Sequence, residues 1–245
     1  MPKWNEAKVI KIVNETATTR RFWLQAVKGG EASFVPGQFV TLDLPIHETR
    51  QKRWRSYSIA NAPSEEGVFE LCIVKLEGGL GTTYLFDAVE VGSTLTYKKP
   101  AGVFTLKKPI ERDLVMICTG TGVAPFRSMV QNIYAQNIPH RKIHLIFGTR
   151  KKEDVLYLEE FQKLVEQEAS FSYSIALSRE EVLPTDSNVS WHKGYVHKIY
   201  QEQYGDFRED VQFLICGWQN MVDEAEEKLL LQGFERGQVK VELYG

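Results

Sequence analysis

Residues 118–125 (Cys-Thr-Gly-Thr-Gly-Val-Ala-Pro) combine residue types and spacing that suit the binding of an anion. They follow the apolar run Asp113–Ile117, which is typical of a buried strand. Gly120 and Gly122 can adopt positive φ and admit a ligand close to the backbone, and Pro125 suits the first turn of a helix. Because a helix N-terminus presents unpaired N–H groups, the pattern predicts a phosphate-binding loop. A tight turn without a ligand is the alternative.

The loop departs from the Gly-x-Gly-x-x-Gly pattern of simple NAD-binding proteins, because Pro125 occupies the third glycine position. The next strand runs through Leu145–Thr149 and is followed by the base Arg150. An acidic residue that could bind a ribose is missing at that position. The simple NAD fingerprint therefore fails, although a phosphate site remains.

A second group, Arg55-Ser56-Tyr57-Ser58, lies in a region with a strand pattern. In a strand, Arg55 and Tyr57 point to one side and Ser56 and Ser58 to the other. A cation and an aromatic ring on one face could hold a pyrophosphate beside a flat ring system. Ser58 offers a hydroxyl to a ring heteroatom. An edge strand with an exposed ion pair explains these four residues equally well.

Two further segments place glycine where ligands are often bound. Gly78–Thr83 begins a predicted helix and could form a second anion site, although a capped helix after a hairpin is the simpler interpretation. Cys216-Gly217 ends the predicted strand Val211–Cys216, at the edge where open α/β sheets bind ligands. A buried thiol followed by a turn is the alternative there.

Length, charge and hydropathy exclude several classes of protein. The 245 residues suffice for one large domain or two modest ones. The formal net charge of −2 gives no basic surplus for nucleic acid. No apolar run approaches the roughly 20 residues of a membrane span, and the first residues lack the layout of a signal peptide. We therefore expect a cytoplasmic monomer without nucleic-acid or membrane partners.

The cysteines and histidines do not predict a metal site. Cys72, Cys118 and Cys216 lie far apart without a Cys-x-x-Cys pair, so zinc ribbons and cysteine-ligated iron–sulfur clusters are not expected. An odd number of scattered cysteines suits a reducing compartment. The five histidines lack ligand spacing, and we expect His144 to be structural.

The first hundred residues consist of short segments rich in β-branched and aromatic residues, separated by turns such as Gly29-Gly30 and Pro36-Gly37. One helix is expected to interrupt them, beginning near Thr82 or Thr83. Six strands at this spacing predict an antiparallel, closed or nearly closed β-barrel. The predicted strands are Ala7–Val13, Thr19–Leu24, Gln38–Leu44, Arg55–Ala60, Phe69–Lys75 and Thr94–Lys98.

After about Lys107, strands and helices alternate, which predicts an α/β domain with a doubly wound, five-stranded parallel sheet. The expected domains are 1–107 and 108–245. The predicted strands are Leu114–Cys118, Lys142–Phe147, Phe171–Leu177, Val211–Cys216 and Val239–Leu243, and the predicted helices are Ala124–Ala135, Leu156–Gln167, Gly194–Gln203 and Met221–Gln232.

Four motifs in order along the chain resemble the ferredoxin–NADP⁺ reductase superfamily. They are Arg55–Ser58, Gly78–Thr82, Gly120–Phe126 and Cys216-Gly217, with Pro36-Gly37-Gln38 in the family's barrel position. Each motif is weak alone, but four in the family's order and spacing, over nearly the whole chain, are specific. The resemblance implies a barrel that binds FAD, an α/β domain that binds NADPH or NADH, and hydride transfer between these cofactors.

The resemblance also implies roles for individual residues. Arg55 would bind the FAD pyrophosphate, Tyr57 would lie against the isoalloxazine, and Ser58 would hydrogen-bond near flavin N5. The implied catalytic residues are Ser58, Cys216, Glu242 and Tyr244. Ser58 and Glu242 would tune the pocket, and neither is expected to act as a nucleophile. The cofactor-binding residues that we predict are Arg55, Ser56, Tyr57, Ser58, Cys72, Ile73, Val74, Gly79, Leu80, Gly81, Thr82, Thr121, Gly122, Pro125, Arg150, Ser178, Arg179, Cys216 and Gly217.

The C-terminal residues Val241–Tyr244 resemble the Val-Glu-Val-Tyr ending of plant-type members, in which the aromatic ring covers the flavin until the nicotinamide displaces it. Here Gly245 follows, and an ordinary tyrosine at a strand end is an equal alternative. Ser178-Arg179 stands where NADP-linked members carry Ser-Arg or Arg. With Arg150, and with Lys193 in the following loop, it favours NADPH over NADH, a solvated surface cluster being the alternative.

The sequence therefore predicts an FAD-dependent NAD(P)H reductase that passes electrons to a separate ferredoxin or flavodoxin. A reductase component of a multi-chain oxygenase is a close rival. Such components often carry a fused [2Fe–2S] domain with a Cys-x₄-Cys-x₂-Cys run, which is missing from this sequence, so the cluster would belong to another chain. A free-flavin reductase and a non-enzymatic flavin-binding redox sensor are the remaining alternatives.

Overall fold

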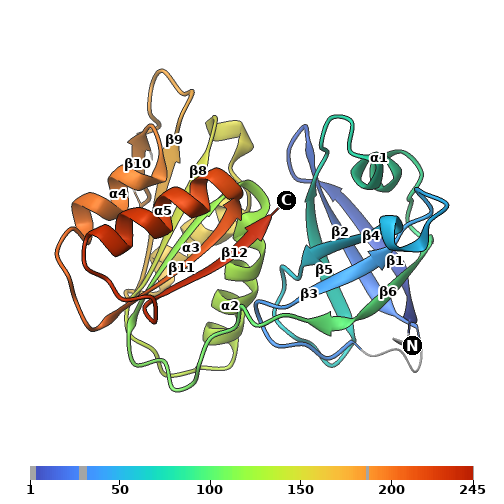
Figure 1. Ribbon diagram of the computed structural model, residues 1–245, viewed down its shortest axis with the longest axis horizontal. Coiled ribbons are helices and arrows are strands. Elements are labelled where there is room, and N and C mark those ends of the chain that lie inside the picture. Colours follow the sequence, from blue (N-terminus) through green and yellow to red (C-terminus); the bar gives the residue numbers. More distant parts are fainter. Residues whose placement is uncertain (1–3, 28–31, 186–187, 245) are drawn as a thin grey trace. The chain divides into compact units, whose positions relative to one another are not determined.

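The computed structural model describes residues 4–27, 32–185 and 188–244, so the predicted turn at Gly29-Gly30 and the terminal Gly245 lie outside the described residues. The chain forms two compact units (Figure 1). One contains residues 1–106 and 124–138, and the other contains residues 107–123 and 139–245. Among the described residues, no helix is long and apolar enough to cross a membrane.

The first unit contains a six-stranded antiparallel sheet, as predicted. Its strand order is β4-β3-β6-β1-β2-β5, so β4 and β5 are the two edges. An isolated bridge between Ile59 and Leu71 joins these edges, which makes the sheet a nearly closed barrel. The strands are β1 (Trp4–Asn14), β2 (Thr19–Ala26), β3 (Phe39–Asp43), β4 (Trp54–Ser58), β5 (Val68–Val74) and β6 (Thr94–Ala101).

The barrel core follows from the alternation of residues along its strands. In β1, Asn5, Ala7 and Val9 are buried and the residues between them are exposed. Because successive side chains of a strand point to opposite faces, one face fills the barrel and the other meets water. Phe69 and Tyr97 pack edge to face in this core, with ring centroids 5.0 Å apart. The predicted interrupting helix is α1 (Leu80–Asp87), and the 3₁₀ turn η1 (Arg50–Arg53) precedes β4.

The second unit contains a parallel sheet of six strands in the order β10-β9-β8-β7-β11-β12. The prediction of five strands was wrong by one, because β10 (Ser190–Lys193) adds an edge strand. Its four residues form no apolar run and pair with β9 alone, so they carry little sequence signal. The other strands are β7 (Asp113–Thr119), β8 (Ile143–Thr149), β9 (Phe171–Leu177), β11 (Val211–Trp218) and β12 (Val239–Tyr244).

Helices cover both faces of this sheet, as expected for a doubly wound fold (Figure 1). Phe161 of α3 (Leu158–Gln167) stacks on Phe171 of β9 at 5.9 Å. Ala176 points to the opposite face, where it packs in one cluster with α4 (Val196–Gln203) and α5 (Gln219–Leu231). The 3₁₀ turn η3 (Lys152–Asp154) follows β8.

Residues 124–138, which include most of α2 (Val123–Ala135), group with the first unit. The expected boundary after residue 107 places this helix in the second domain, because it lies between two parallel strands in the sequence. Three of its side chains, Arg127, Ser128 and Gln131, hydrogen-bond to residues 60–62 of the first unit. These contacts are the physical reason for the difference.

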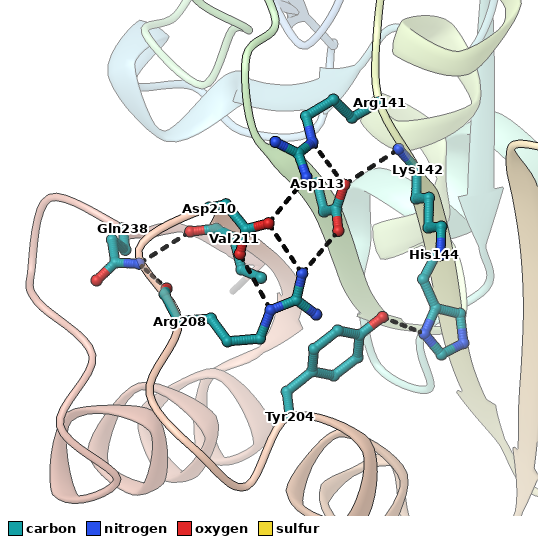
Figure 2. A network of polar contacts seen from close by, with 9 residues as sticks. All are labelled: Asp113, Arg141, Lys142, His144, Tyr204, Arg208, Asp210, Val211 and Gln238. Carbon is teal, nitrogen blue, oxygen red and sulfur yellow. Dashed lines mark hydrogen bonds and ion pairs between the residues drawn. The ribbon is translucent and has the colours of Figure 1, made fainter.

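A polar network lies at the amino end of the parallel sheet (Figure 2). Asp113, the first residue of β7, accepts hydrogen bonds from Arg141 at 3.2 Å and from Arg208 at 3.0 Å. Arg208 also pairs with Asp210 at 3.0 Å, just before β11 begins. These charges therefore neutralise one another where β7 and β11 begin.

His144 of β8 is buried beside this network. Its Nδ1 lies 2.9 Å from the Tyr204 hydroxyl, and its Nε2 lies 2.8 Å from the Ser174 hydroxyl. Burial, with a smaller contribution from the nearby His192, lowers the pKa of His144 to about 4. His144 is therefore a neutral structural residue at pH 7, bonded on both ring nitrogens.

Acidification should weaken the second unit through His144. Its pKa is 6.5 when unfolded and about 4 when folded, so its contribution to stability is complete above pH 6.5 and is lost as the pH falls toward 4. The loss is roughly 3 kcal/mol. Hydrogen exchange of the β8 amides, corrected for intrinsic rates, measures it between about pH 7 and about pH 4. His144→Gln should remove most of this pH dependence and the exposed His47→Gln should not; an unchanged dependence in His144→Gln would contradict the assignment.

Candidate functional site

Arg55 of β4 packs against the first turn of α1. A Cβ built on Gly81 would lie 2.9 Å from Arg55 Cγ, so any side chain at residue 81 would displace the arginine. Arg55 NH1 also donates hydrogen bonds to the carbonyls of Lys52 at 3.0 Å and Trp54 at 2.7 Å, which hold the guanidinium in place. A fixed cation beside the start of a helix fits the pyrophosphate of FAD.

The start of α1 supplies backbone donors beside Arg55. Gly79 is the N-cap residue, and no side chain caps the helix, so the N–H groups of Leu80, Gly81 and Thr82 have no intrahelical partner. The Thr82 hydroxyl accepts from the Leu76 N–H at 3.1 Å and donates to the Gly79 carbonyl at 3.1 Å. The Thr82 hydroxyl is therefore used within its own loop. The group with which Thr82 can bind a phosphate is its backbone N–H.

The other residues of the β4 motif have distinct environments. Burial raises the pKa of Tyr57 to about 12, and the charge of Arg55 opposes this shift only in part, so the phenol stays protonated at neutral pH. Ser58 is buried, at 5% exposure. The Ser56 hydroxyl is exposed and lies 2.9 Å from the Thr41 hydroxyl. Arg55 and Tyr57 are therefore half-buried and Ser58 is buried, whereas the exposed Ser56 bonds to the neighbouring strand.

The edges of the barrel face each other where Cys72, Ile73 and Val74 lie. These residues pair with β2 on one side, and the only pairing between β4 and β5 among the described residues is the bridge of Ile59 with Leu71. An edge strand presents a row of backbone N–H and C=O groups. Two such rows suit a flat heterocycle with both donors and acceptors, which is the character of an isoalloxazine.

The glycine loop of the second unit forms the 3₁₀ turn η2 (Gly120–Gly122) between β7 and α2. Gly120 has a φ of +52° and uses the conformational freedom of glycine, whereas Gly122 is not among the glycines with positive φ. Gly122 is required for a different reason: a Cβ there would collide with the backbone carbonyl of Cys216. Thr121 is partly exposed between them, and Pro125 lies in the first turn of α2, as predicted.

The ends of β7 and β11 meet at this loop. Cys118 and Cys216 are register partners. The next residue, Gly217, lies so close to β7 that a Cβ there would be 2.5 Å from the Thr119 hydroxyl. That hydroxyl is buried and has no hydrogen-bond partner among the described residues. A buried polar group without a partner is costly, so this orphan hydroxyl fits a site that a polar ligand completes.

Strand β12 brings Glu242 and Tyr244 beside Cys216. Glu242 is the register partner of Cys216, and Tyr244 is that of Trp218. Burial raises the pKa of the Cys216 thiol well above its usual range, Glu242 and Cys118 raise it further, and a hydrogen bond with Tyr244 lowers it in part. Cys216 is therefore a neutral thiol, in keeping with a role other than that of a nucleophile.

Basic residues gather at the carboxyl ends of β8 and β9. The Arg179 N–H donates to the Arg150 carbonyl at 2.9 Å, and the Ser178 hydroxyl donates to the Thr149 carbonyl at 3.3 Å. Lys193 lies in β10, beside Leu177, and not in a loop as expected. Among the residues that the structure describes, neither Arg150 nor Arg179 has a carboxylate within 4.0 Å, so this cluster can accept an anionic group.

Comparisons with known proteins identify two consecutive domains in the chain. The oxidoreductase FAD-binding domain matches residues 6–106, and the oxidoreductase NAD-binding domain matches residues 116–227. The ferredoxin–NADP reductase B of Sorangium cellulosum is 32% identical, over 98% of this chain and 97% of that protein. The phenol hydroxylase P5 protein of Acinetobacter pittii is 30% identical over 92% of this chain, which spans only 61% of that protein. The structure of an Amycolatopsis cytochrome P450 reductase superposes with a TM-score of 0.85 at 26% identity, over 98% of this chain and 69% of that chain.

Sequence reasoning missed Thr119 as a site residue. Its signal was present, because a hydroxyl at the carboxyl end of the strand before a glycine loop stands where ligands bind. That this hydroxyl has no hydrogen-bond partner among the described residues depends on the register of β7 with β11, which no local pattern reveals.

Gly122→Ala should weaken binding of the nicotinamide nucleotide by about tenfold or more, because the backbone must move away from the Cys216 carbonyl and phosphate hydrogen bonds are lost. The FAD content should stay unchanged. Difference spectroscopy with NADP⁺ measures the dissociation constant. Gly237→Ala is the matched control, since a Cβ there has no neighbour within 4 Å. Equal affinity in the Gly122 variant and the wild type would refute the role of the loop.

Proposed function

Because the chain belongs to the ferredoxin–NADP⁺ reductase superfamily, we propose that it transfers a hydride from NADPH to FAD and passes the electrons singly to a separate carrier protein such as ferredoxin or flavodoxin. The chain is an oxidoreductase with an FAD-binding and an NAD-binding domain, which sets aside a non-enzymatic redox sensor. When bound, FAD accepts a hydride and can release two electrons one at a time.

The proposal rests on two separate sites that suit an anion. Each contains a position where only glycine fits. One lies at Arg55 and Gly81, and the other lies at Gly122. Each is the start of a helix, where N–H groups and the helix dipole favour phosphates. Two such sites suit the two pyrophosphates of a flavin and a nicotinamide nucleotide.

In the first unit, the residues of β4 would hold and orient the flavin. Arg55 would neutralise the pyrophosphate, and the neutral ring of Tyr57 would lie against the isoalloxazine. Ser58, which is buried, offers its hydroxyl near flavin N5. The backbone of Cys72, Ile73 and Val74 supplies hydrogen bonds along the facing edge. These groups supply position and electrostatics, not a nucleophile.

In the second unit, the loop of Thr121 and Gly122 would hold the pyrophosphate of the nucleotide. The Thr119 hydroxyl and the Cys216 thiol then lie where the nicotinamide enters, and Glu242 adds a negative charge to that environment. Tyr244 would cover the flavin until the nicotinamide displaces it. Hydride transfer requires the nicotinamide C4 to approach flavin N5 to about 3–3.5 Å.

The preference for NADPH rests on the basic cluster of Arg150, Ser178 and Arg179. Two adjacent strand ends carry guanidinium groups, without carboxylate partners among the described residues. A 2′-phosphate needs such donors, whereas the ribose of NADH does not.

Arg179→Ala should raise KM for NADPH about tenfold or more and change KM for NADH by less than about twofold, because charge-assisted hydrogen bonds to the 2′-phosphate are lost. Steady-state kinetics with an artificial acceptor measures both constants. Arg236→Ala, another exposed arginine of the second unit, should change neither. Equal effects of Arg179→Ala on both nucleotides would show that this residue does not read the 2′-phosphate.

A second candidate, the reductase component of an oxygenase, is favoured by the similarity to the phenol hydroxylase P5 protein and to a cytochrome P450 reductase. The present chain spans 61% of the former and 69% of the latter. In this role the acceptor would be an iron–sulfur or oxygenase protein on another chain.

Acceptor assays decide between the two candidates and a free-flavin reductase. NADPH oxidation is followed with the source organism's ferredoxins, its flavodoxins, its oxygenase components and free FMN in parallel. The proposal expects the highest kcat/KM with a ferredoxin or flavodoxin. A preference for an oxygenase component would favour the second candidate, and purification without FAD together with turnover of free FMN would refute the proposal.

The proposal includes a cytoplasmic location. Cys72, Cys118 and Cys216 are all buried and form no disulfide in the described part of the chain. Thiols persist in reducing compartments, which supports this location.

A further inference from the structure

One face of α2 carries polar side chains into the interior of the first unit. Arg127 is 5% exposed and Ser128 is fully buried, although arginine is among the residues least often found inside proteins. Arg127 stands only five residues after Gly122, in the part of α2 that follows the glycine loop. Its partners therefore decide where that part of the helix is attached.

Three consecutive residues of the barrel receive these side chains. Arg127 donates to the Ala60 carbonyl at 2.8 Å, and Ser128 donates to the Asn61 carbonyl at 2.6 Å. The Gln131 side-chain oxygen accepts from the Ala62 N–H at 3.0 Å. Residues 60–62 follow Ser58, the last residue of β4, after Ile59, so α2 is bonded to the segment that continues the strand of the flavin motif.

Glu70 of β5 is the centre of the charges beneath this contact. It is 2% exposed, and its two carboxylate oxygens pair with Arg127 at 2.9 Å and with Arg21 at 2.6 Å. Arg21 also pairs with Glu15 at 3.1 Å. Arg127, Glu70, Arg21 and Glu15 are therefore connected by successive ion pairs. The Glu70 backbone bonds to the same segment, through the Ala60 N–H at 2.8 Å and the Asn61 side chain at 2.7 Å.

A buried network of this kind contributes little to the net free energy of folding. Both charges of a buried ion pair lose their water, and apolar residues of similar size often stabilise a core as well or better. What the charges add is direction, because charge-assisted hydrogen bonds fix the groups that they join. The network thus ties β2, β5, the end of β4 and α2 to one another with defined geometry.

We propose that the Arg127–Glu70 pair is a positioning clamp for hydride transfer. It holds residues 127–131 of α2 against residues 60–62, the segment that follows the flavin strand β4 in the first unit. The inference rests on the proposed function, since it assigns the pair to the placement of that strand, and of Ser58, for hydride transfer. Neither residue touches a reacting atom. A displacement of about 1 Å at the reacting centre can slow such a step about 100-fold.

The test uses the FAD-loaded protein and three variants. Glu70→Gln removes the carboxylate but leaves two buried arginines, so it can lose stability for that reason alone. The double variant Glu70→Gln, Arg127→Met removes the buried pair together, while Arg21 keeps Glu15. Glu202→Gln, which breaks the exposed pair with Lys198 at 3.7 Å, is the control. Stopped-flow bleaching of the flavin by NADPH gives the hydride-transfer rate, and hydrogen exchange reports on residues 60–62 and α2 without any substrate.

The clamp predicts that the double variant keeps its FAD content and thermal midpoint, loses exchange protection at residues 60–62, and transfers hydride about 10- to 100-fold more slowly. The Glu202 variant should match the wild type in all three. A double variant that is as fast as the wild type would overturn the clamp and leave the proposed function intact. A wild-type protein that NADPH does not bleach would overturn both.

Discussion

Two contacts that exclude a side chain shape the two places where we propose that this chain binds phosphates. At Gly81 the first turn of α1 lies against Arg55, and at Gly122 the loop after β7 lies against the backbone of Cys216. In both places a methyl group would separate elements whose N–H groups must converge on an anion. The cation in one unit and the orphan hydroxyl of Thr119 in the other stand beside these contacts. The local geometry of both half-sites therefore depends on backbone packing that only glycine permits.

Charge is distributed according to the task that each part performs. Arg150 and Arg179 are exposed at strand ends and suit a phosphate that arrives from solvent, whereas Arg127 is buried and paired with Glu70. Close to the expected reacting atoms, burial keeps two groups neutral: it raises the pKa of Tyr57 to about 12 and that of Cys216 well above its usual range. Neither group is ionised at pH 7, in keeping with redox chemistry that the flavin supplies.

Local patterns were sufficient for the elements that carry strong periodicity or glycine. The strands around Arg55 and before Gly120 followed from alternation and apolar runs, and the order of four motifs predicted both cofactors. β10 was missed because four residues with one neighbour have no periodic signal. The contact that requires glycine at residue 122 was not predicted, since it is made with Cys216, 94 positions later in the sequence. The attachment of α2 through Arg127 could not be predicted either. An arginine in an amphipathic helix is expected at the surface unless its buried partner, here Glu70, is known.

The central claim is that this chain binds FAD and reduces it with a hydride from NADPH. Anaerobic mixing of the FAD-loaded protein with NADPH, and with NADPH deuterated at the transferred position of C4, tests it most directly. Hydride transfer predicts that the visible flavin band bleaches in both experiments and that deuterium slows the bleaching. A protein that binds FAD but stays yellow in excess NADPH and in excess NADH would contradict the claim.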